Sequence, residues 1–172
     1  MKLTGKHIAY LVEEGFEDLE FWVPLMRLRE EGARVTVVGS GSAQQYTGKH
    51  CLQATPDMHA GDVSADDFDA LVVPGGWAPD QLRRYAAVLD LVRGVYQQGK
   101  IVAAICHAGW VLASAGIVRG HRVTGSKGIK DDMINAGATW VDEAAFRDGN
   151  LVCGRVVEDI PDFCRELVQA LE

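Results

Sequence analysis

The chain has 172 residues, of which 48% are hydrophobic, and its 17 basic and 24 acidic side chains give a formal net charge of −7. This length and apolar content predict one globular domain over residues 1–172 with a full hydrophobic core. The acidic balance, without a basic run, argues against a nucleic-acid groove or an anionic membrane surface and favours a small-molecule or protein substrate.

The first apolar run, residues 8–12, is too short for a signal peptide or a membrane span, so we expect a cytoplasmic protein. The four cysteines lack the C-x-x-C and Cys/His spacings typical of zinc sites. In a reducing compartment they do not predict disulfides either. We therefore expect no metal and no cofactor, and we assign Cys51, Cys153 and Cys164 to packing.

The first third of the chain predicts a β-α-β unit. Residues 8–12 form a buried strand, residues 16–31 a helix, and residues 34–39 a second strand, joined by a right-handed parallel crossover. The helix has one predicted apolar stripe, formed by Leu19, Trp22, Val23 and Met26. Residues 40–61 predict short irregular strands with a hairpin around residues 46–49.

The rest of the chain continues the alternation. The predicted strands are 69–73, 101–105, 123–124, 139–142 and 146–154, the last folded around a turn at 148–150 that adds a hairpin to the sheet edge. The predicted helices are 80–98 with a break near Tyr85, 110–115, 129–136 and 160–171. The pattern predicts an α/β sandwich with a mostly parallel sheet.

Cys106 lies where the apolar strand 101–105 changes into a helix. A nucleophile on such a turn needs small residues two positions away on either side, and Ala104 and Ala108 stand there. A helix N-terminus favours thiolate and predicts a lowered pKa for this cysteine. Cys106 is therefore a candidate nucleophile, and the alternative is a small buried cysteine beside a capping histidine.

A Pro-Gly-Gly run at 74–76 follows directly after the strand 69–73, at the edge where parallel sheets bind ligands. The exposed N–H groups of Gly75 and Gly76 suit an oxyanion site beside the thiol. An ordinary strand-to-helix turn explains the same residues.

Four motifs in the same order make the sequence resemble the PfpI-type intracellular protease and deglycase family. They are Phe16-Glu17-Asp18, Pro74-Gly75-Gly76, Ala104-Ile105-Cys106-His107, and Lys130 to Gly137 with Trp140-Val141-Asp142. The resemblance covers nearly the whole chain. It implies a flavodoxin-like fold related to class I glutamine amidotransferases, with a cysteine nucleophile elbow.

The resemblance also implies roles for single residues. Cys106 is the nucleophile, Glu17 lies beside its sulfur, and His107 is the base. To donate a hydrogen bond to a thiolate, Glu17 has to be protonated, which requires a raised pKa. Without the family, Glu17 is a first-turn glutamate that complements the helix dipole. His107 alternatively contributes its backbone N–H to the oxyanion site with Gly75 and Gly76.

Two positions depart from the family pattern. Proteases of the family carry a glutamate that orients the histidine across a subunit contact, and the residue here is Asp80, which is one methylene shorter. The resemblance therefore leaves the third member of a triad open. The second is Ala108-Gly109-Trp110, where the family usually has Gly-Pro followed by a polar or aliphatic residue, and we expect Trp110 to line or narrow the cleft or to join the core.

The resemblance leaves three functions open. The first is a stress-response hydrolase that repairs or detoxifies methylglyoxal and glyoxal adducts, acting on small aldehyde-derived molecules or glycated proteins. The second is an intracellular cysteine peptidase. The third is an oxidation sensor or redox-regulated chaperone that uses Cys106 without turnover. We also expect a homodimer or a larger homo-oligomer, with Trp77 near the contact.

Overall fold

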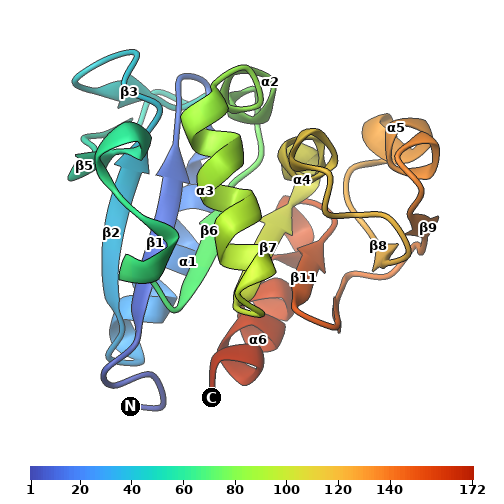
Figure 1. The fold of residues 1–172 in the computed structure, drawn as a ribbon. Coiled ribbons are helices and arrows are strands. Elements are labelled where there is room, and N and C mark those ends of the chain that lie inside the picture. The colour runs from blue at the N-terminus through green and yellow to red at the C-terminus, as the bar shows by residue number, and fades with distance from the viewer.

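The computed structural model describes all residues from 1 to 172, and its main feature is a seven-stranded sheet (Figure 1). The strands lie in the order β10-β11-β7-β6-β1-β2-β5. All neighbouring pairs are parallel except β10 and β11, which form an antiparallel hairpin. The bounds are β1 His7–Val12, β2 Arg34–Gly39, β5 Met58–His59, β6 Ala70–Val73, β7 Ile101–Ile105, β10 Ala145–Asp148 and β11 Leu151–Gly154.

Helices cover both faces of this sheet (Figure 1). On one face α1 (Asp18–Glu30) and α6 (Ile160–Leu171) pack side by side, and on the other α3 (Ala86–Gln97) and α4 (Gly109–Ala115) pack against each other with the short α2 (Ala78–Leu82) above them. The helices are all too short or too polar to span a bilayer. The three layers confirm the predicted flavodoxin-like α/β sandwich.

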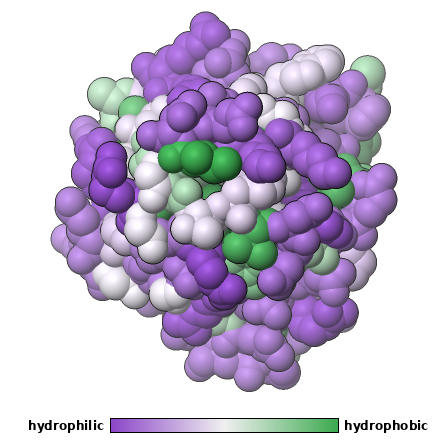
Figure 2. Space-filling model, turned by 90° about the vertical axis from the view of Figure 1, so that its right-hand side faces the viewer, coloured by the Kyte–Doolittle hydropathy of each residue, from purple (hydrophilic) through white to green (hydrophobic).

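Short elements complete the chain. β3 (Tyr46–Thr47) pairs antiparallel with β4 (Gln53–Ala54), and β8 (Arg122–Val123) pairs parallel with β9 (Thr139–Trp140). α5 (Lys130–Asn135) packs against α4 and β9. Single 3₁₀ turns lie at η1 Ala60–Asp62, η2 Ala65–Asp67, η3 Cys106–Ala108, η4 Lys127–Ile129 and η5 Val157–Asp159. Figure 2 shows that the side with α5, β8 and β9 is mostly hydrophilic, with apolar residues only in small separate groups.

The central strand β7 has every residue buried, because β6 and β11 flank it and helices cover both of its faces. This explains its unbroken run of apolar residues. The predicted break of the second long helix is also confirmed, since Tyr85 separates α2 from α3 and is the N-cap of α3. The predicted edge hairpin differs in one respect. β10 is the edge strand, but β11 lies inside the sheet beside β7.

The prediction of the buried face of α1 was wrong. Phe21, Leu25 and Leu28 face the sheet and are fully buried, whereas most of the predicted stripe is exposed: Leu19 is 47% exposed, Val23 40% and Met26 59%. Both faces of this helix carry apolar residues, so its periodicity did not decide which of them packs. The predicted packing role of Cys51 was also wrong, because this residue is exposed.

The carboxyl ends of β1, β6 and β7 lie next to one another at the upper edge of the sheet in Figure 1. The loop after β1 meets the loop after β6 through an antiparallel bridge between Phe16 and Gly76. The third loop begins at Cys106. Three segments far apart in the sequence are therefore brought together at one edge.

Candidate active site

Cys106 occupies a sharp turn between β7 and α4. Its backbone φ is +63°, an uncommon value for a residue with a side chain. Gly75 lies so close to it that a Cβ atom there would be 2.7 Å from the Cys106 Cβ and 2.2 Å from Glu20 Oε2. The predicted strand-to-helix elbow is confirmed, and the half-buried thiol lines a cleft.

Glu20, not Glu17, lies beside the sulfur. The Glu20 carboxyl faces the Cys106 thiol, and its Oε2 accepts a hydrogen bond of 3.0 Å from the Gly75 N–H. Burial raises the pKa of Glu20 to about 8, and the neighbouring Glu17 charge adds to this effect. The thiol, the Gly75 N–H and Lys49 act in the opposite direction. Glu20 therefore keeps its proton at neutral pH and can donate it to the sulfur.

Glu17 has a different position because α1 begins only after it. Its side chain caps the helix, with Oε2 accepting from the Glu20 N–H at 2.8 Å. Oε1 lies 3.6 Å from His50 Nε2 at the cleft wall. The sequence prediction that placed Glu17 at the sulfur was wrong, and the capping role resembles the alternative that was considered for it.

The three predicted oxyanion donors differ in where their backbone N–H groups point. The backbone N–H groups of Gly76 and His107 point at the Cys106 sulfur. The N–H of Gly75 is already used by Glu20, so Gly75 is not a free donor, contrary to the prediction. Its carbonyl accepts from the Glu17 N–H at 3.0 Å, which fixes the turn.

The side chain of His107 reaches the thiol even though the two residues are adjacent in the sequence. Its Nδ1 lies 3.2 Å from the Cys106 Sγ. Burial, and then the charge of Lys49, lower the pKa of this imidazole. His107 is thus neutral at pH 7 and placed to accept a proton, and it also offers its backbone N–H.

The predicted lowering of the Cys106 pKa was wrong for the free protein. Burial, and after it the charge of Glu20, raise the pKa of the thiol to about 12, although the backbone N–H groups of His107 and Gly76 act in the opposite direction. Glu20 repels a thiolate when it is ionised and donates to it when it is protonated. A thiolate at Cys106 is therefore better stabilised while Glu20 holds its proton.

Asp80 lines the same cleft but does not orient His107 in this chain. Its Oδ2 lies 2.7 Å from Arg84 Nη2, one helical turn further on. No hydrogen bond joins it to the imidazole, because α2 begins beside the cleft and carries the side chain toward Arg84. A triad within one chain is therefore not formed.

The cleft has a volume of about 580 Å³. Besides the residues already named, its walls include groups that sequence reasoning had not assigned to the site: Lys49, His50, Gln81, Val156, Val157 and Glu158. Two tryptophans also line it. Trp77 is 65% exposed, and the Trp110 ring packs against the His107 ring in a T-shaped pair with 5.1 Å between the ring centroids. No group of three or more His, Cys, Asp or Glu side chains is arranged to hold a metal ion.

Lys49 and His50 come from the loop between β3 and β4, and their place in the cleft depends on a buried carboxylate. Asp18 accepts hydrogen bonds of 2.8 Å from the backbone N–H groups of His50 and Leu52. No local pattern predicts this contact, because the partners are more than thirty positions apart. Asp18 belongs to the Phe-Glu-Asp motif, and its presence there was the one feature of the sequence that pointed to a role for this carboxylate.

Comparisons with known proteins agree with this geometry. The model of the DJ-1/PfpI family matches residues 6–170. The chain is 43% identical to a deglycase of Pyrococcus abyssi and 41% identical to deglycase PfpI of Pyrococcus furiosus, in each case over 96% of this chain and 99% of the relative. It is 36% identical to "Putative cysteine protease YraA" of Bacillus subtilis, over 98% of this chain and 99% of that protein.

Solved structures show the same fold. DJ-1beta of Drosophila melanogaster matches with a TM-score of 0.90 at 30% identity, over 96% of this chain and 90% of that one. A two-domain protein of Anabaena variabilis, with a DJ-1/ThiJ/PfpI-like and a ferritin-like domain, matches with a TM-score of 0.94 at 40% identity. That match covers 96% of this chain and 48% of the longer one.

Proposed function

Because this chain belongs to the DJ-1/PfpI family, we propose that it is a cysteine-dependent hydrolase that removes methylglyoxal and glyoxal adducts in stress defence. The relatives named deglycase, at 41% and 43% identity, support this reading. The observation that carries it is the convergence at one sulfur: the N–H groups of Gly76 and His107 and the carboxyl of Glu20 all face Cys106.

Two neighbouring groups have the protonation states that the chemistry needs. At pH 7 the buried Glu20 holds a proton, while His107 lacks one because its pKa is lowered. Such a pair separates the acid from the base. His107 Nδ1, at 3.2 Å from the sulfur, takes the thiol proton, and Glu20 is the donor.

In the proposed first step the Cys106 thiolate attacks a carbonyl carbon of the adduct. The new C–S bond uses a sulfur electron pair, and the C=O π pair moves to oxygen. Gly76 and His107 donate their N–H groups to this oxyanion, and Glu20 supplies a proton. Hydrogen then moves within the adduct from the carbinol carbon, which bears the amine or thiol, to the former carbonyl carbon, so that the first carbon is oxidised to the carboxyl level as the second is reduced to an alcohol, and the C–S bond breaks to restore Cys106. One water is consumed overall, and the products are the free amine or thiol and an α-hydroxy acid, which is lactate from methylglyoxal and glycolate from glyoxal.

The test is steady-state turnover of preformed methylglyoxal adducts of N-acetylcysteine and N-acetyllysine, with lactate measured as product. Cys106→Ser should abolish turnover, and Cys51→Ser, which removes an exposed cysteine outside the cleft, should retain it. An oxidation sensor would give at most one equivalent of reaction. A rate that never exceeds spontaneous adduct dissociation would show that the substrate is the free aldehyde.

Peptide hydrolysis is the second candidate, supported by the Bacillus subtilis relative. It is weaker because Asp80 is paired with Arg84 and leaves His107 without a carboxylate from its own chain. A partner subunit could supply one only in an oligomer. We propose a homodimer or larger homo-oligomer with the exposed Trp77 at the contact, and light scattering at micromolar concentration tests it. A monomer throughout would remove Asp80 from the mechanism.

A further inference from the structure

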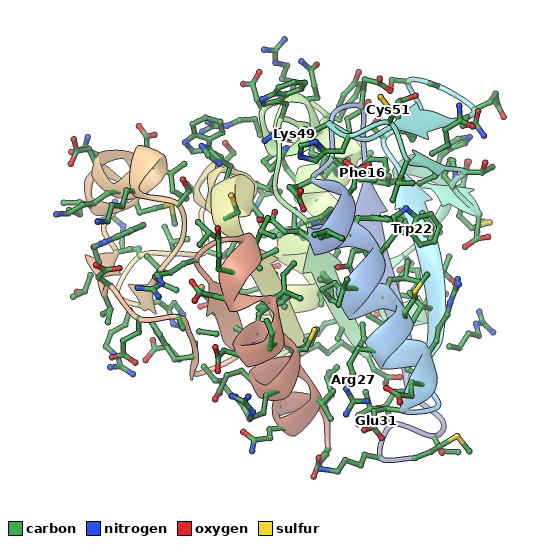
Figure 3. The ribbon with its side chains drawn as sticks, turned by 180° about the vertical axis from the view of Figure 1, so that it is seen from behind. Phe16, Trp22, Arg27, Glu31, Lys49 and Cys51 are labelled. Carbon is green, nitrogen blue, oxygen red and sulfur yellow. The ribbon has the colours of Figure 1, made fainter.

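The loop that carries Lys49 is held firmly against the beginning of α1. The Lys49 N–H donates to the Phe16 carbonyl at 2.9 Å, next to the buried Asp18 carboxylate that binds the rest of the loop. A Cβ at Gly48 would lie 2.5 Å from Asp18 Oδ2, so the close contact between the loop and the Asp18 carboxylate requires glycine at position 48. Figure 3 shows Lys49 near Phe16, at the end of the molecule opposite Arg27 and Glu31.

The Lys49 ammonium lines the cleft without an anionic partner. It lies 5.4 Å from the centre of the Trp77 ring and forms no ion pair with any carboxylate of the protein. The cleft carboxylates have other roles. Glu17 caps a helix, Glu20 is protonated, and Asp80 binds Arg84. Glu158 is exposed and forms no ion pair with the lysine.

The positive charge acts on the reacting groups. Lys49 lowers the pKa of both Glu20 and His107, the two side chains that face the thiol. An unpaired cation at this place attracts an anion bound in the same cleft, and an aromatic neighbour does not neutralise it. The volume of about 580 Å³ is in the usual range for small-molecule sites and leaves room for a second group beside the carbonyl.

We propose that Lys49 binds a carboxylate of the substrate while the substrate carbonyl lies at Cys106. The preferred substrates are then aldehyde adducts of free amino acids or of chain-terminal residues, which carry a carboxylate near the modified group. Adducts on residues inside a protein chain lack that carboxylate and are poorer substrates. This inference rests on the proposed hydrolase function and adds a substrate class to it.

The first test compares the methylglyoxal adducts of N-acetylcysteine and of its amide, which differ only in carboxylate against carboxamide. We expect the parent to prefer the carboxylate about ten-fold in kcat/KM at low salt, in line with one charge-assisted hydrogen bond. Lys49→Met should remove the preference by slowing the carboxylate substrate more than the carboxamide, because its effect on the pKa of Glu20 and His107 is common to both substrates. Lys49→Arg should keep part of it, and Lys130→Met, which removes an exposed lysine outside the cleft, should keep all of it.

Equal rates for the two adducts, or a preference that survives in Lys49→Met, would overturn the role of Lys49 and leave the proposed hydrolase standing. Loss of all turnover in the parent would instead defeat the hydrolase.

A second test does not depend on turnover. In a Cys51→Ser background, Cys106 is alkylated with iodoacetate and with iodoacetamide, and peptide mass spectrometry follows the modified site. We expect Lys49→Met to lower the iodoacetate-to-iodoacetamide rate ratio about three-fold or more, and added salt to lower it in the parent, as for a partly screened charge. An unchanged iodoacetate-to-iodoacetamide rate ratio in Lys49→Met would show that Lys49 does not attract an anion to the thiol.

Discussion

Glutamine in place of Glu20 keeps the size of the side chain and removes its titratable proton. The pKa of Glu20 is raised from 4.5 to about 8, so the native state holds the proton more tightly than the unfolded chain between these two values. The free energy of unfolding therefore falls as pH rises from 4.5 and is lowest above about 8. At 1.36 kcal/mol per pKa unit, the full effect is about 5 kcal/mol.

Glutamine at this position carries a neutral amide that does not ionise, so the free energy of unfolding of the variant does not fall with pH in this way. We expect Glu20→Gln to be more stable than the parent at pH 8, by up to about 5 kcal/mol and on the order of 10 °C in Tm. The two proteins should converge near pH 4.5. The amide has no acidic proton to donate, however, so kcat should fall roughly 100-fold or more. A gain in stability and a loss of turnover are thus expected from one substitution.

Thermal unfolding followed by circular dichroism across this pH range, with steady-state kinetics on the same samples, measures both effects. Glu17→Gln is the matched control, because it changes a nearby cleft carboxyl that does not touch the sulfur. It should retain most of the turnover and a smaller pH dependence of stability, because the Glu17 charge contributes to the raised pKa of Glu20. Parental turnover in Glu20→Gln, or an unchanged pH dependence of its stability, would refute the assignment of Glu20 as a buried acid.

Other residues of the cleft give separate tests. Limiting iodoacetamide at pH 7 should label the exposed Cys51 before Cys106, and mass spectrometry showing the reverse order would contradict the raised pKa of the Cys106 thiol. The kcat/KM should fall at low pH as His107 gains a proton and above about pH 8 as Glu20 loses one, so a flat pH profile would exclude this acid and base. Gly75→Ala brings a Cβ to 2.2 Å from Glu20 Oε2, and we expect loss of turnover and a stability loss of about 1–3 kcal/mol; a fully active variant would show that the turn can relax.

The sequence was sufficient for the buried strands but not for every helix face. β7 is an unbroken apolar run because it is covered on both sides, and such a run is recognisable without a structure. Helix α1 was harder, because Val23 and Met26 repeat at helical spacing just as Leu25 and Leu28 do. Only the packing against the sheet decides which set is buried.

The turn that carries Cys106 was predictable from the sequence, and the groups around it were less so. Cys106 lies where the hydrophobic pattern changes from that of a buried strand to that of a helix, and this change is visible in the neighbouring residues alone. The choice between Glu17 and Glu20 depends on where α1 begins, and helix ends are uncertain by one or two residues in any sequence reading. Lys49 was not predictable, because a loop distant in sequence is drawn to the cleft by the Asp18 carboxylate.

The adjacent positions of β1, β6 and β7 also affect how the protein folds. Glu20 and Gly75 are 55 residues apart in the sequence, and Cys106 joins them only when β7 has paired with β6. Contacts of this separation form slowly, because the entropy of closing the intervening loops has to be overcome first. A chain that has paired only its first two strands already contains native helix and sheet but has not assembled the cleft around Cys106. Recovery of turnover after dilution from denaturant should therefore lag behind recovery of the circular dichroism signal, and it reports the moment at which the middle of the sheet closes.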